Sequence, residues 1–245
     1  MSTQQTRVAL VTGGSGGIGR SVVRRLAQDG YAVAVHYAGN PERAQEVVEE
    51  ITKESGQAIA VGGDVADEQA MAAAFEATQA AFGGIDVVVN TAGIMVLAPI
   101  ATLSLDDLDR MHRTNIRGTF VVSQLAAQQL RAGGAIINFS TTVTRTQLPT
   151  YGAYVASKAA VEGMTLILAR ELRGKDITVN AVAPGPTATP LFLNGKDESL
   201  VATLAKAAPL ERLGQPEDIA ETVAFLAGPA RWVNGQVLFS NGGLA

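Results

Sequence analysis

Short apolar runs alternate with longer amphipathic segments from one end of the chain to the other. Most of these runs are almost continuously apolar, which is typical of parallel strands buried on both faces of a sheet. The predicted strands are 8–12, 32–37, 58–63, 86–90, 135–140, 177–182 and 236–240.

Helical patterns fill the intervals between these runs. Gly30 and Gly56 follow two of them, and Pro41 stands where a first helical turn tolerates proline. The predicted helices are 19–29, 41–55, 67–82, 104–131, 152–173 and 216–227. This alternation favours right-handed crossovers and predicts an α/β fold: one Rossmann domain over residues 1–245, with a seven-stranded doubly wound parallel sheet and helices on both faces. Residues 184–209 hold four prolines and are predicted to form a loop or flap.

Composition removes several classes of function. The 245 residues include 19 basic and 23 acidic side chains, for a net charge of −4, which argues against a nucleic acid partner. The chain has no cysteine and only two histidines, so thiol chemistry is excluded and no metal site is expected. It shows neither a signal-peptide pattern nor an apolar run long enough to span a bilayer, so a cytoplasmic protein without a membrane partner is predicted.

A glycine-rich stretch, TGGSGGIG, occupies residues 12–19 between the first strand and the first helix. Glycines at this point let backbone N–H groups approach a diphosphate at a helix N-terminus. The alternative is a tight turn that serves only strand–helix packing. We predict a dinucleotide-binding loop whose contacts come from Gly13, Ser15, Gly16, Gly17, Ile18 and Gly19.

The end of the second strand bears on the choice of dinucleotide. A carboxylate there would favour NAD(H), but residues 36–40 read HYAGN and contain no acid, so NADP(H) is predicted instead. No arginine stands at the usual loop position, where Gly16 is found. Asn40, the turn amides and His36 could hold the 2′-phosphate, and the alternative for His36 is a half-exposed residue at the strand end. The contacts at this turn are assigned to His36, Tyr37, Ala38 and Asn40.

Tyr154 and Lys158 stand at positions i and i+4 at the start of a predicted helix, so their side chains share one face. A free tyrosine has a pKa near 10, which a nearby ammonium group lowers. The pair therefore predicts a tyrosine that transfers a proton.

The motifs TGGSGGIG, Asp64-Val65, NTAG (90–93), Asn115, YVASK (154–158) and PGPTAT (184–189) resemble those of the classical short-chain dehydrogenases/reductases in order and spacing. The resemblance extends through NGG at 241–243. The sequence around the motifs is most similar to that of polyhydroxynaphthalene reductases and 3-oxoacyl-carrier-protein reductases.

The resemblance implies a role for each matching residue. Tyr154 would exchange a proton with the substrate oxygen, Lys158 would lower the tyrosine pKa and hold the nicotinamide ribose, and Asn115 would hold a relay water. Asp64 and Val65 would flank the adenine. The remaining cofactor contacts would come from Asn90, Ala92, Gly93, Pro184, Gly185, Thr187 and Thr189.

One position departs from the family pattern. The serine that hydrogen-bonds the substrate oxygen stands thirteen residues before the tyrosine, and here that residue is Thr141. A threonine hydroxyl can donate the same bond. Ser140 should point to the opposite face of an extended strand, and could substitute only if the strand end bulges. Thr141 is therefore the predicted residue.

The sequence thus predicts an NADP(H)-dependent oxidoreductase that interconverts a ketone or quinone-like carbonyl and a secondary alcohol. One alternative is a 3-oxoacyl thioester reductase, and another is an NADP-sensing protein that has lost catalysis. Family resemblance and two apolar segments, 152–173 (with Val161, Met164, Leu168 and Leu172) and 232–244, predict a homotetramer. The substrate walls are assigned to Ile94, Met95, Val96, Val143, Arg145, Tyr151, Leu191 and Phe192.

Overall fold

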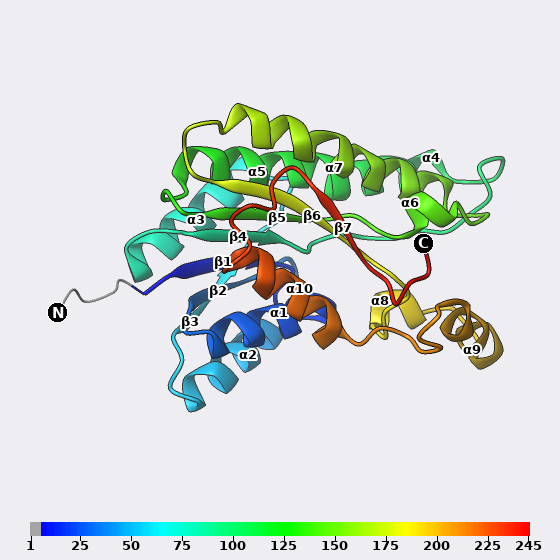
Figure 1. The fold of residues 1–245 in the computed structure, drawn as a ribbon, viewed down its shortest axis with the longest axis horizontal. Coiled ribbons are helices and arrows are strands. Elements are labelled where there is room, and N and C mark those ends of the chain that lie inside the picture. The colour runs from blue at the N-terminus through cyan, green and yellow to red at the C-terminus, as the bar shows by residue number, and fades with distance from the viewer. Residues whose placement is uncertain (1–5) are drawn as a thin grey trace.

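The seven strands form one parallel sheet in the order β3-β2-β1-β4-β5-β6-β7, in a computed structural model that describes residues 6–245 (Figure 1). The predicted fold class is confirmed. Strand bounds differ from the predicted ones by two residues or fewer. They are β1 Val8–Thr12, β2 Ala32–Tyr37, β3 Ala58–Gly62, β4 Val87–Asn90, β5 Ala135–Phe139, β6 Thr178–Pro184 and β7 Val237–Ser240.

Helices cover both faces of this sheet, with α1, α2 and α10 on one side and α3, α5 and α7 on the other (Figure 1). The longer helices are α1 Gly17–Gln28, α2 Pro41–Lys53, α3 Glu68–Phe82, α5 Gly118–Gln129, α7 Gly152–Glu171 and α10 Pro216–Ala227. The shorter ones are α4 Leu105–Met111, α6 Val143–Thr146, α8 Pro190–Leu193 and α9 Glu198–Ala207.

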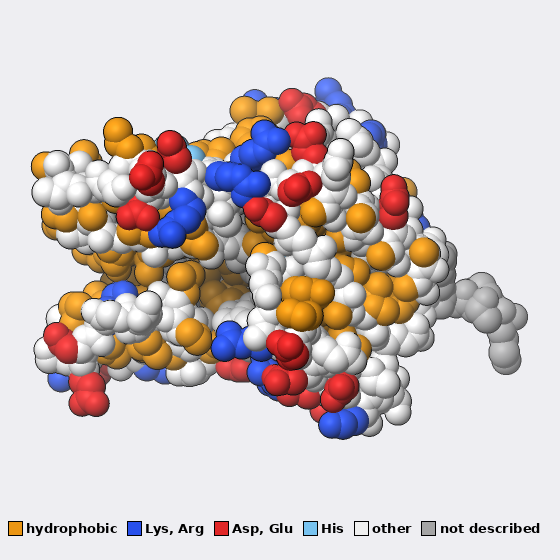
Figure 2. All heavy atoms as spheres, turned by 180° about the vertical axis from the view of Figure 1, so that it is seen from behind, with side chains coloured by type: hydrophobic (Ala, Val, Ile, Leu, Met, Phe, Trp, Pro, Cys, Tyr) orange, Lys and Arg blue, Asp and Glu red, His pale blue; other side chains and the backbone are white. Residues whose placement is uncertain are grey.

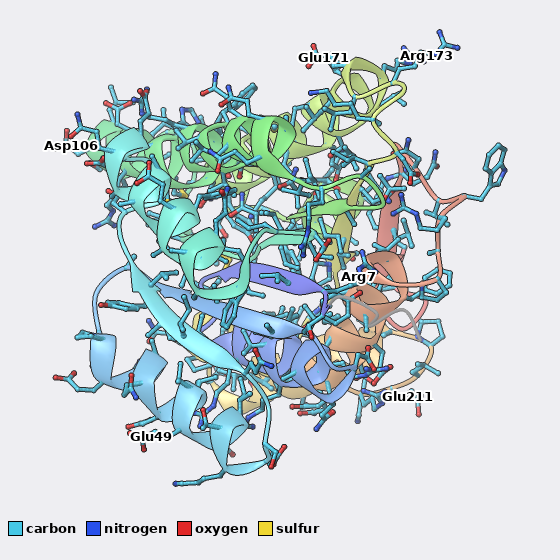
Figure 3. The ribbon with its side chains drawn as sticks, turned by 90° about the vertical axis from the view of Figure 1, so that its left-hand side faces the viewer. Arg7, Glu49, Asp106, Glu171, Arg173 and Glu211 are labelled. Atoms are coloured by element: carbon cyan, nitrogen blue, oxygen red, sulfur yellow. The ribbon has the colours of Figure 1, made fainter. Side chains whose placement is uncertain are left out.

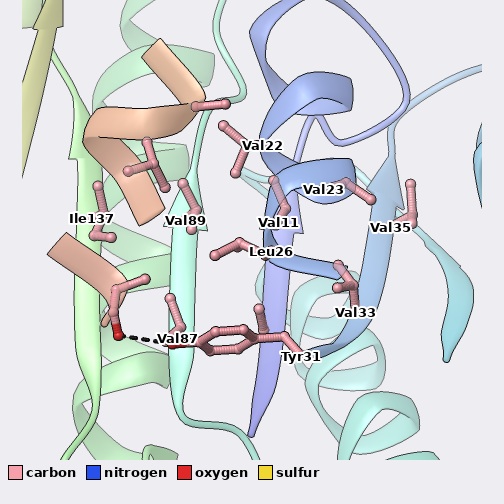
Figure 4. Close-up of a cluster of buried hydrophobic side chains, with 14 of the residues drawn as sticks. Val11, Val22, Val23, Leu26, Tyr31, Val33, Val35, Val87, Val89 and Ile137 are labelled. Carbon is pink, nitrogen blue, oxygen red and sulfur yellow. Dashed lines mark hydrogen bonds between the residues drawn. The ribbon is translucent and has the colours of Figure 1, made fainter. Parts of the chain in front are cut away.

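Alternate strand residues supply two separate cores. On the α1 side, Val11, Val33 and Val89 pack against Val22 and Leu26, as Figure 4 shows. On the other side, residues one position along the same strands, including Leu10, Ala34 and Val88, pack against α3, α5 and α7. Because both faces are buried, the strands need the continuous apolar runs that their sequences show.

Two stretches differ from the prediction. The single helix expected over residues 104–131 is interrupted between α4 and α5 by η1, a π-helical segment at His112–Arg117. Such insertions are invisible to a 3.6-residue pattern and occur often at functional sites. The loop expected over residues 184–209 contains α8 and α9, each capped by a side chain, Thr189 and Asp197 respectively. The turn helix α6 was not predicted.

Residues near the two ends of the described chain lie together. Ser21 and Arg25 on α1 contact Glu217 and Glu221 on α10, at 2.9 and 2.7 Å. Arg7, labelled in Figure 3, donates to the carbonyl oxygens of Ala227 and Gly133 and to the Tyr31 hydroxyl. The Tyr31 hydroxyl itself donates to the Ala227 carbonyl oxygen (Figure 4).

The apolar stripe predicted to form a subunit contact on α7 is partly wrong. Val161 on α7 and Leu172 directly after it are buried in the core of this chain, 1% and 4% exposed, because α7 packs directly on the sheet. The large apolar side chains exposed on α5 and α7 are Phe120, Leu166 and Ile167, and Trp232 is fully exposed before β7. Within the described residues, no helix is long and apolar enough to cross a membrane.

The strand order runs from β1 to β3 toward one edge of the sheet and from β4 to β7 toward the other, so it reverses between β1 and β4. In such sheets the loops beyond the carboxyl ends of the two central strands diverge and leave a crevice where ligands bind. The predicted glycine-rich loop, the NTAG segment, Thr141 and the PGPTAT segment all lie at or just beyond the carboxyl ends of strands.

Candidate active site

The glycine-rich loop connects β1 to α1. Gly13 and Gly17 have φ angles of 65° and 51°, in the left-handed region that favours glycine. A Cβ atom on Gly19 would lie 2.2 Å from the Gly13 carbonyl oxygen, whereas one on Gly16 would meet nothing within 4 Å. Among the described residues no side chain caps α1 at Gly16. The first N–H groups of α1 are therefore available to an anion, and the loop fits a dinucleotide diphosphate.

Thr12, which the sequence analysis did not single out, joins this loop to the end of β4. Its hydroxyl donates to Asn90 Oδ1 at 2.6 Å and accepts from the Ala92 N–H at 3.2 Å, and its carbonyl oxygen accepts from the Thr91 hydroxyl. Asn90 is only 3% exposed and is turned toward Thr12, so its side chain supports the loop from within the sheet. A threonine at a strand end gives no local signal of this role.

The turn after β2 differs from the prediction at His36. The imidazole is fully buried, and its Nδ1 lies 3.5 Å from the Gly13 nitrogen, a long hydrogen bond beneath the loop. The ring therefore matches neither the predicted contact to a 2′-phosphate nor the alternative of a half-exposed residue at the strand end. Burial lowers the pKa of His36 to about 4, so the ring is neutral at pH 7.

The other residues of this turn are placed differently. The Tyr37 ring packs over Gly62, since a Cβ on Gly62 would lie 2.8 Å from it. Ala38 and Asn40 are exposed, and Asn40 Oδ1 accepts from the Arg43 N–H as the N-cap of α2. The turn thus offers backbone groups and no carboxylate to a ligand.

Asp64 and Val65 follow β3. Burial acts to raise the pKa of the Asp64 carboxyl, but the Ala66 N–H and the pairing with Arg113 of η1 hold that pKa below its usual range. Val65 is 3% exposed and packs on Gly118, where a Cβ would lie 2.6 Å from the valine side chain. The η1 segment therefore reaches the predicted adenine end of the site.

Tyr154 and Lys158 lie one turn apart at the start of α7. Lys158 is 5% exposed, its Nζ donates to the Phe139 carbonyl oxygen at 2.9 Å, and it lies 5.8 Å from the centre of the Tyr154 ring. Burial raises the pKa of Tyr154 to about 12, although a hydrogen bond with Thr141 acts in the opposite direction. Burial also lowers the pKa of Lys158 to about 8.

The lowered tyrosine pKa expected from the Tyr-Lys spacing is thus not found in this structure. Removal of the phenol from water raises its pKa, and the lysine ammonium, 5.8 Å from the centre of the ring, does not reverse that effect. The Tyr151 ring meets the Tyr154 ring edge-on, with centroids 6.5 Å apart.

Asn115 lies within η1 and is fully buried. Its side chain accepts from the Ile94 N–H and donates to the Ile94 carbonyl oxygen, both at 2.9 Å, and donates to the Ser157 hydroxyl at 3.0 Å. A Cβ on Gly93 would lie 3.3 Å from both Asn115 Oδ1 and Lys158 Nζ. Asn115 therefore ties α7 to the NTAG segment and lies close to Lys158.

Thr141 and Ser140 both border the same cavity, but their hydroxyls have different partners. The Thr141 hydroxyl accepts from the Val143 N–H at 3.3 Å and acts to lower the pKa of Tyr154, whereas the Ser140 hydroxyl donates to Glu162 at 2.5 Å. The arrangement thus favours Thr141 as the hydroxyl beside the tyrosine.

The PGPTAT segment continues from β6 into α8. Thr187 is 4% exposed and its hydroxyl donates to the Gly185 carbonyl oxygen at 2.9 Å. Thr189, 6% exposed, is the N-cap of α8, and its Cβ would lie 3.9 Å from a Cβ on Gly17. This segment therefore lies directly opposite the glycine-rich loop.

Residues at the end of β5, at the start of α7 and in the PGPTAT segment line one cavity of about 200 Å³. Thr141, Tyr154 and Lys158 form part of its wall, beside Ile18 and Gly93 at the glycine-rich side. Figure 2 shows the hollow between the two protruding parts of the molecule, at the left of the view, flanked by hydrophobic side chains. An acid, an ammonium group and an orienting hydroxyl in an apolar cavity next to a dinucleotide loop suit proton transfer coupled to hydride transfer.

Five of the eight residues predicted to form the substrate walls line this cavity. Met95, Val143, Tyr151, Leu191 and Phe192 line it, whereas Ile94, Val96 and Arg145 do not. Arg145 instead lies over the Phe239 ring, 4.8 Å from its centre. The wall residues that the sequence analysis missed include Thr146, Leu148, Leu204, Ala207 and Leu244.

Several known proteins are similar to this chain over nearly its whole length. A family model described as Enoyl-(Acyl carrier protein) reductase matches residues 13–245. A short-chain type dehydrogenase/reductase of Picea abies is 45% identical, with 97% of this chain and 92% of the relative covered. The 3-oxoacyl-(acyl-carrier-protein) reductase FabG of Staphylococcus aureus is 42% identical, with 98% and 99% covered.

Among solved structures, a short chain dehydrogenase from Burkholderia cenocepacia in complex with NADP aligns with a TM-score of 0.92 and 40% identity, and 98% of each chain is covered. These matches extend over nearly the whole chain and confirm the resemblance that its motifs indicate. The protein belongs to the short-chain dehydrogenase/reductase family.

Proposed function

We propose that the protein is an NADP(H)-dependent oxidoreductase that interconverts a ketone or quinone-like carbonyl and a secondary alcohol. The observation that carries the proposal is the single cavity lined by Tyr154, Thr141 and Lys158, which opens beside the glycine-rich loop. Its remaining lining is mostly apolar, so an uncharged, hydrophobic or aromatic carbonyl compound is the substrate class that suits it.

The cofactor preference rests on the turn after β2. Residues 38–40 are exposed and include no carboxylate that would repel a 2′-phosphate. The NADP complex of the Burkholderia relative supports the same choice. When bound, the nicotinamide would supply or accept a hydride. The glycine-rich loop would hold the diphosphate, and Asp64 with Val65 the adenine.

Tyr154 is the proton donor in reduction. With a pKa of about 12 its hydroxyl is protonated at neutral pH, and it can donate to a carbonyl oxygen as negative charge develops there. Lys158, with a pKa of about 8, is mostly protonated at pH 7 and stabilises the phenolate that remains. Thr141 donates a second hydrogen bond that orients the substrate oxygen.

Asn115 is proposed to connect Lys158 with solvent through a water molecule. Its carboxamide oxygen accepts one bond, from the Ile94 N–H, and so keeps a second lone pair. Its closeness to Lys158 at Gly93 supports this role.

A second candidate is the reduction of 3-oxoacyl thioesters. The Staphylococcus aureus relative carries that name, and the family model is described by an acyl-carrier-protein activity. The same residues would perform the chemistry, so the substrate panel has to decide between the two.

The test is NADPH oxidation with a panel of ketones, quinones and 3-oxoacyl thioesters, together with NADPH binding by fluorescence. Tyr154→Phe should lower kcat by about 10²–10⁴-fold and leave the NADPH Kd nearly unchanged, because only the hydroxyl is removed. A variant that keeps more than about a tenth of kcat would exclude Tyr154 as the acid. Binding of NADPH without turnover of any compound would favour the sensing protein instead.

We also infer a homotetramer in the cytoplasm. The exposed Phe120, Leu166 and Ile167 on α5 and α7 are apolar side chains of the kind that subunit contacts cover. Light scattering at micromolar concentration should give the mass of four chains, and a monomer mass would contradict the inference.

A further inference from the structure

Glu162 lies on α7, one turn beyond Lys158 and two turns beyond Tyr154, and no role in the proposed chemistry accounts for it. Its half-buried carboxylate accepts two hydroxyl hydrogen bonds on the same oxygen. Ser140 donates to Glu162 Oε1 at 2.5 Å, and Thr144 donates to the same oxygen at 2.9 Å.

Those two hydroxyls come from either side of Thr141. Ser140 directly precedes it at the end of β5, and Thr144 follows in α6. The Thr144 hydroxyl also lies 2.9 Å from the Thr141 carbonyl oxygen, so its single proton is shared between that oxygen and Glu162. The Glu162 carboxylate on α7 is therefore hydrogen-bonded to the residue before Thr141 and to a residue three positions after it.

The backbone of this turn has its other attachments on β6. The Ser140 N–H donates to the Val182 carbonyl oxygen at 2.8 Å, and the Thr142 N–H donates to that of Pro184 at 2.9 Å. These bonds fix the turn relative to the sheet but not relative to α7. The hydrogen bonds from the Ser140 and Thr144 hydroxyls to Glu162 connect the turn to α7, the helix that carries Tyr154.

We propose that Glu162 is a positioning residue that holds the β5–α6 turn against α7, so that the Thr141 hydroxyl stays directed at Tyr154. The proposal rests on the proposed function, since its catalytic effect requires Tyr154 and Thr141 to act on one substrate oxygen. Hydrogen bonds to an ionised acceptor are shorter and stronger than neutral ones, which suits a carboxylate to this task.

Two variants separate the hydrogen bonds from the charge. Glu162→Ala removes both acceptor bonds and should lower kcat by about tenfold, with the NADPH Kd within about twofold of wild type. Glu162→Gln keeps an acceptor oxygen of the same reach and should retain kcat within about threefold. Glu171→Ala is the matched control, because Glu171 is exposed at the far end of the same helix (Figure 3).

A double-mutant cycle distinguishes positioning from a general structural role. If Glu162 acts through Thr141, then Glu162→Ala should change kcat by less than about twofold in a Thr141→Ala background. Effects that multiply in the double variant would overturn the proposal, as would a wild-type kcat for Glu162→Ala.

Hydrogen–deuterium exchange gives a readout that needs no turnover. Amides of residues 141–147 should exchange several-fold faster in Glu162→Ala than in Glu171→Ala. Unchanged exchange would overturn the positioning role of Glu162 and leave the proposed function standing. If the wild type reduces no carbonyl compound while Glu162→Ala loosens the turn, the proposed function fails and takes the catalytic role of Glu162 with it.

Discussion

The two sides of the cavity are built in different ways. The side next to the glycine-rich loop uses groups at the ends of central strands, such as Gly93 and the Phe139 carbonyl oxygen that holds Lys158, and Thr12 fastens the loop to β4. The opposite side uses α8, α9 and Leu244, and it includes Leu191, which is 48% exposed. The first side has its geometry fixed by the sheet, whereas the second can change without disturbing the sheet. Substitutions on the first side should therefore change stability and cofactor binding, and those on the second side should change substrate binding.

The largest effect is expected at Gly19. Gly19→Ala would place a methyl group 2.2 Å from the Gly13 carbonyl oxygen, so the loop and α1 must separate. We expect the free energy of unfolding to fall by about 3 kcal/mol or more, with loss of NADPH binding. Gly163→Ala, on α7 with nothing within 4 Å, should instead raise it by about 0.5–1 kcal/mol. Urea unfolding measures both, and a stable Gly19→Ala variant would contradict the rigidity assigned to this side.

The buried His36 should make stability depend on pH. Its pKa is about 4 in the folded protein and near 6.5 in an unfolded chain, so between these values the unfolded state binds more protons. Its stabilising contribution is complete above pH 6.5 and is lost as the pH falls toward 4, by up to about 3 kcal/mol. Unfolding by urea at pH 7, 5.5 and 4.5 should show a shallower pH dependence for His36→Asn. Equal slopes for wild type and variant would contradict this account.

A smaller effect is expected at the exposed turn after β2. Ala38→Asp adds a carboxylate where a 2′-phosphate would bind, and should weaken NADPH binding by about 10–100-fold while changing NADH binding far less. Ala38→Asn has the same shape without the charge and should change NADPH binding only a few-fold. Fluorescence titration of both variants with each cofactor gives the comparison. A wild-type preference for NADH would contradict the assignment.

The smallest effect is expected on the opposite side. Leu204→Ala enlarges the cavity and should raise the KM of a bulky carbonyl substrate by about three- to tenfold, with the NADPH Kd unchanged. Leu200→Ala makes the same truncation on α9 at a residue that is 42% exposed and is absent from the cavity wall, so its kinetics should match wild type. A loss of NADPH affinity in Leu204→Ala would show that the two sides are coupled.

The sequence predicts most of the first side because its signals are local. Strand ends, the glycine spacing and the four-residue separation of Tyr154 and Lys158 each depend on neighbours along the chain. What it misses depends on contacts between distant segments. Thr12 and Glu162 have unremarkable neighbours in sequence, and only the fold brings them to Ala92 and Ser140.

The errors have the same origin. His36 stands at a strand end, where exposure is usual, but here the glycine-rich loop covers it. The apolar stripe on α7 included Val161 and Leu172, and the sequence does not say which face of a largely apolar helix meets its own sheet. Leu204 and Leu244 line the cavity because α9 and the segment after β7 return across it, and no local pattern encodes that return.

The pairing of α1 with α10 has a consequence for how the chain acquires its structure. Ser21 meets Glu217 and Arg25 meets Glu221, and each pair is separated by 196 residues of sequence. Contacts of such high contact order form only after a costly loop closure, so they slow folding. During synthesis, the part of α1 that α10 covers has to wait for α10 to emerge from the ribosome, and until then it is a surface on which aggregation can begin.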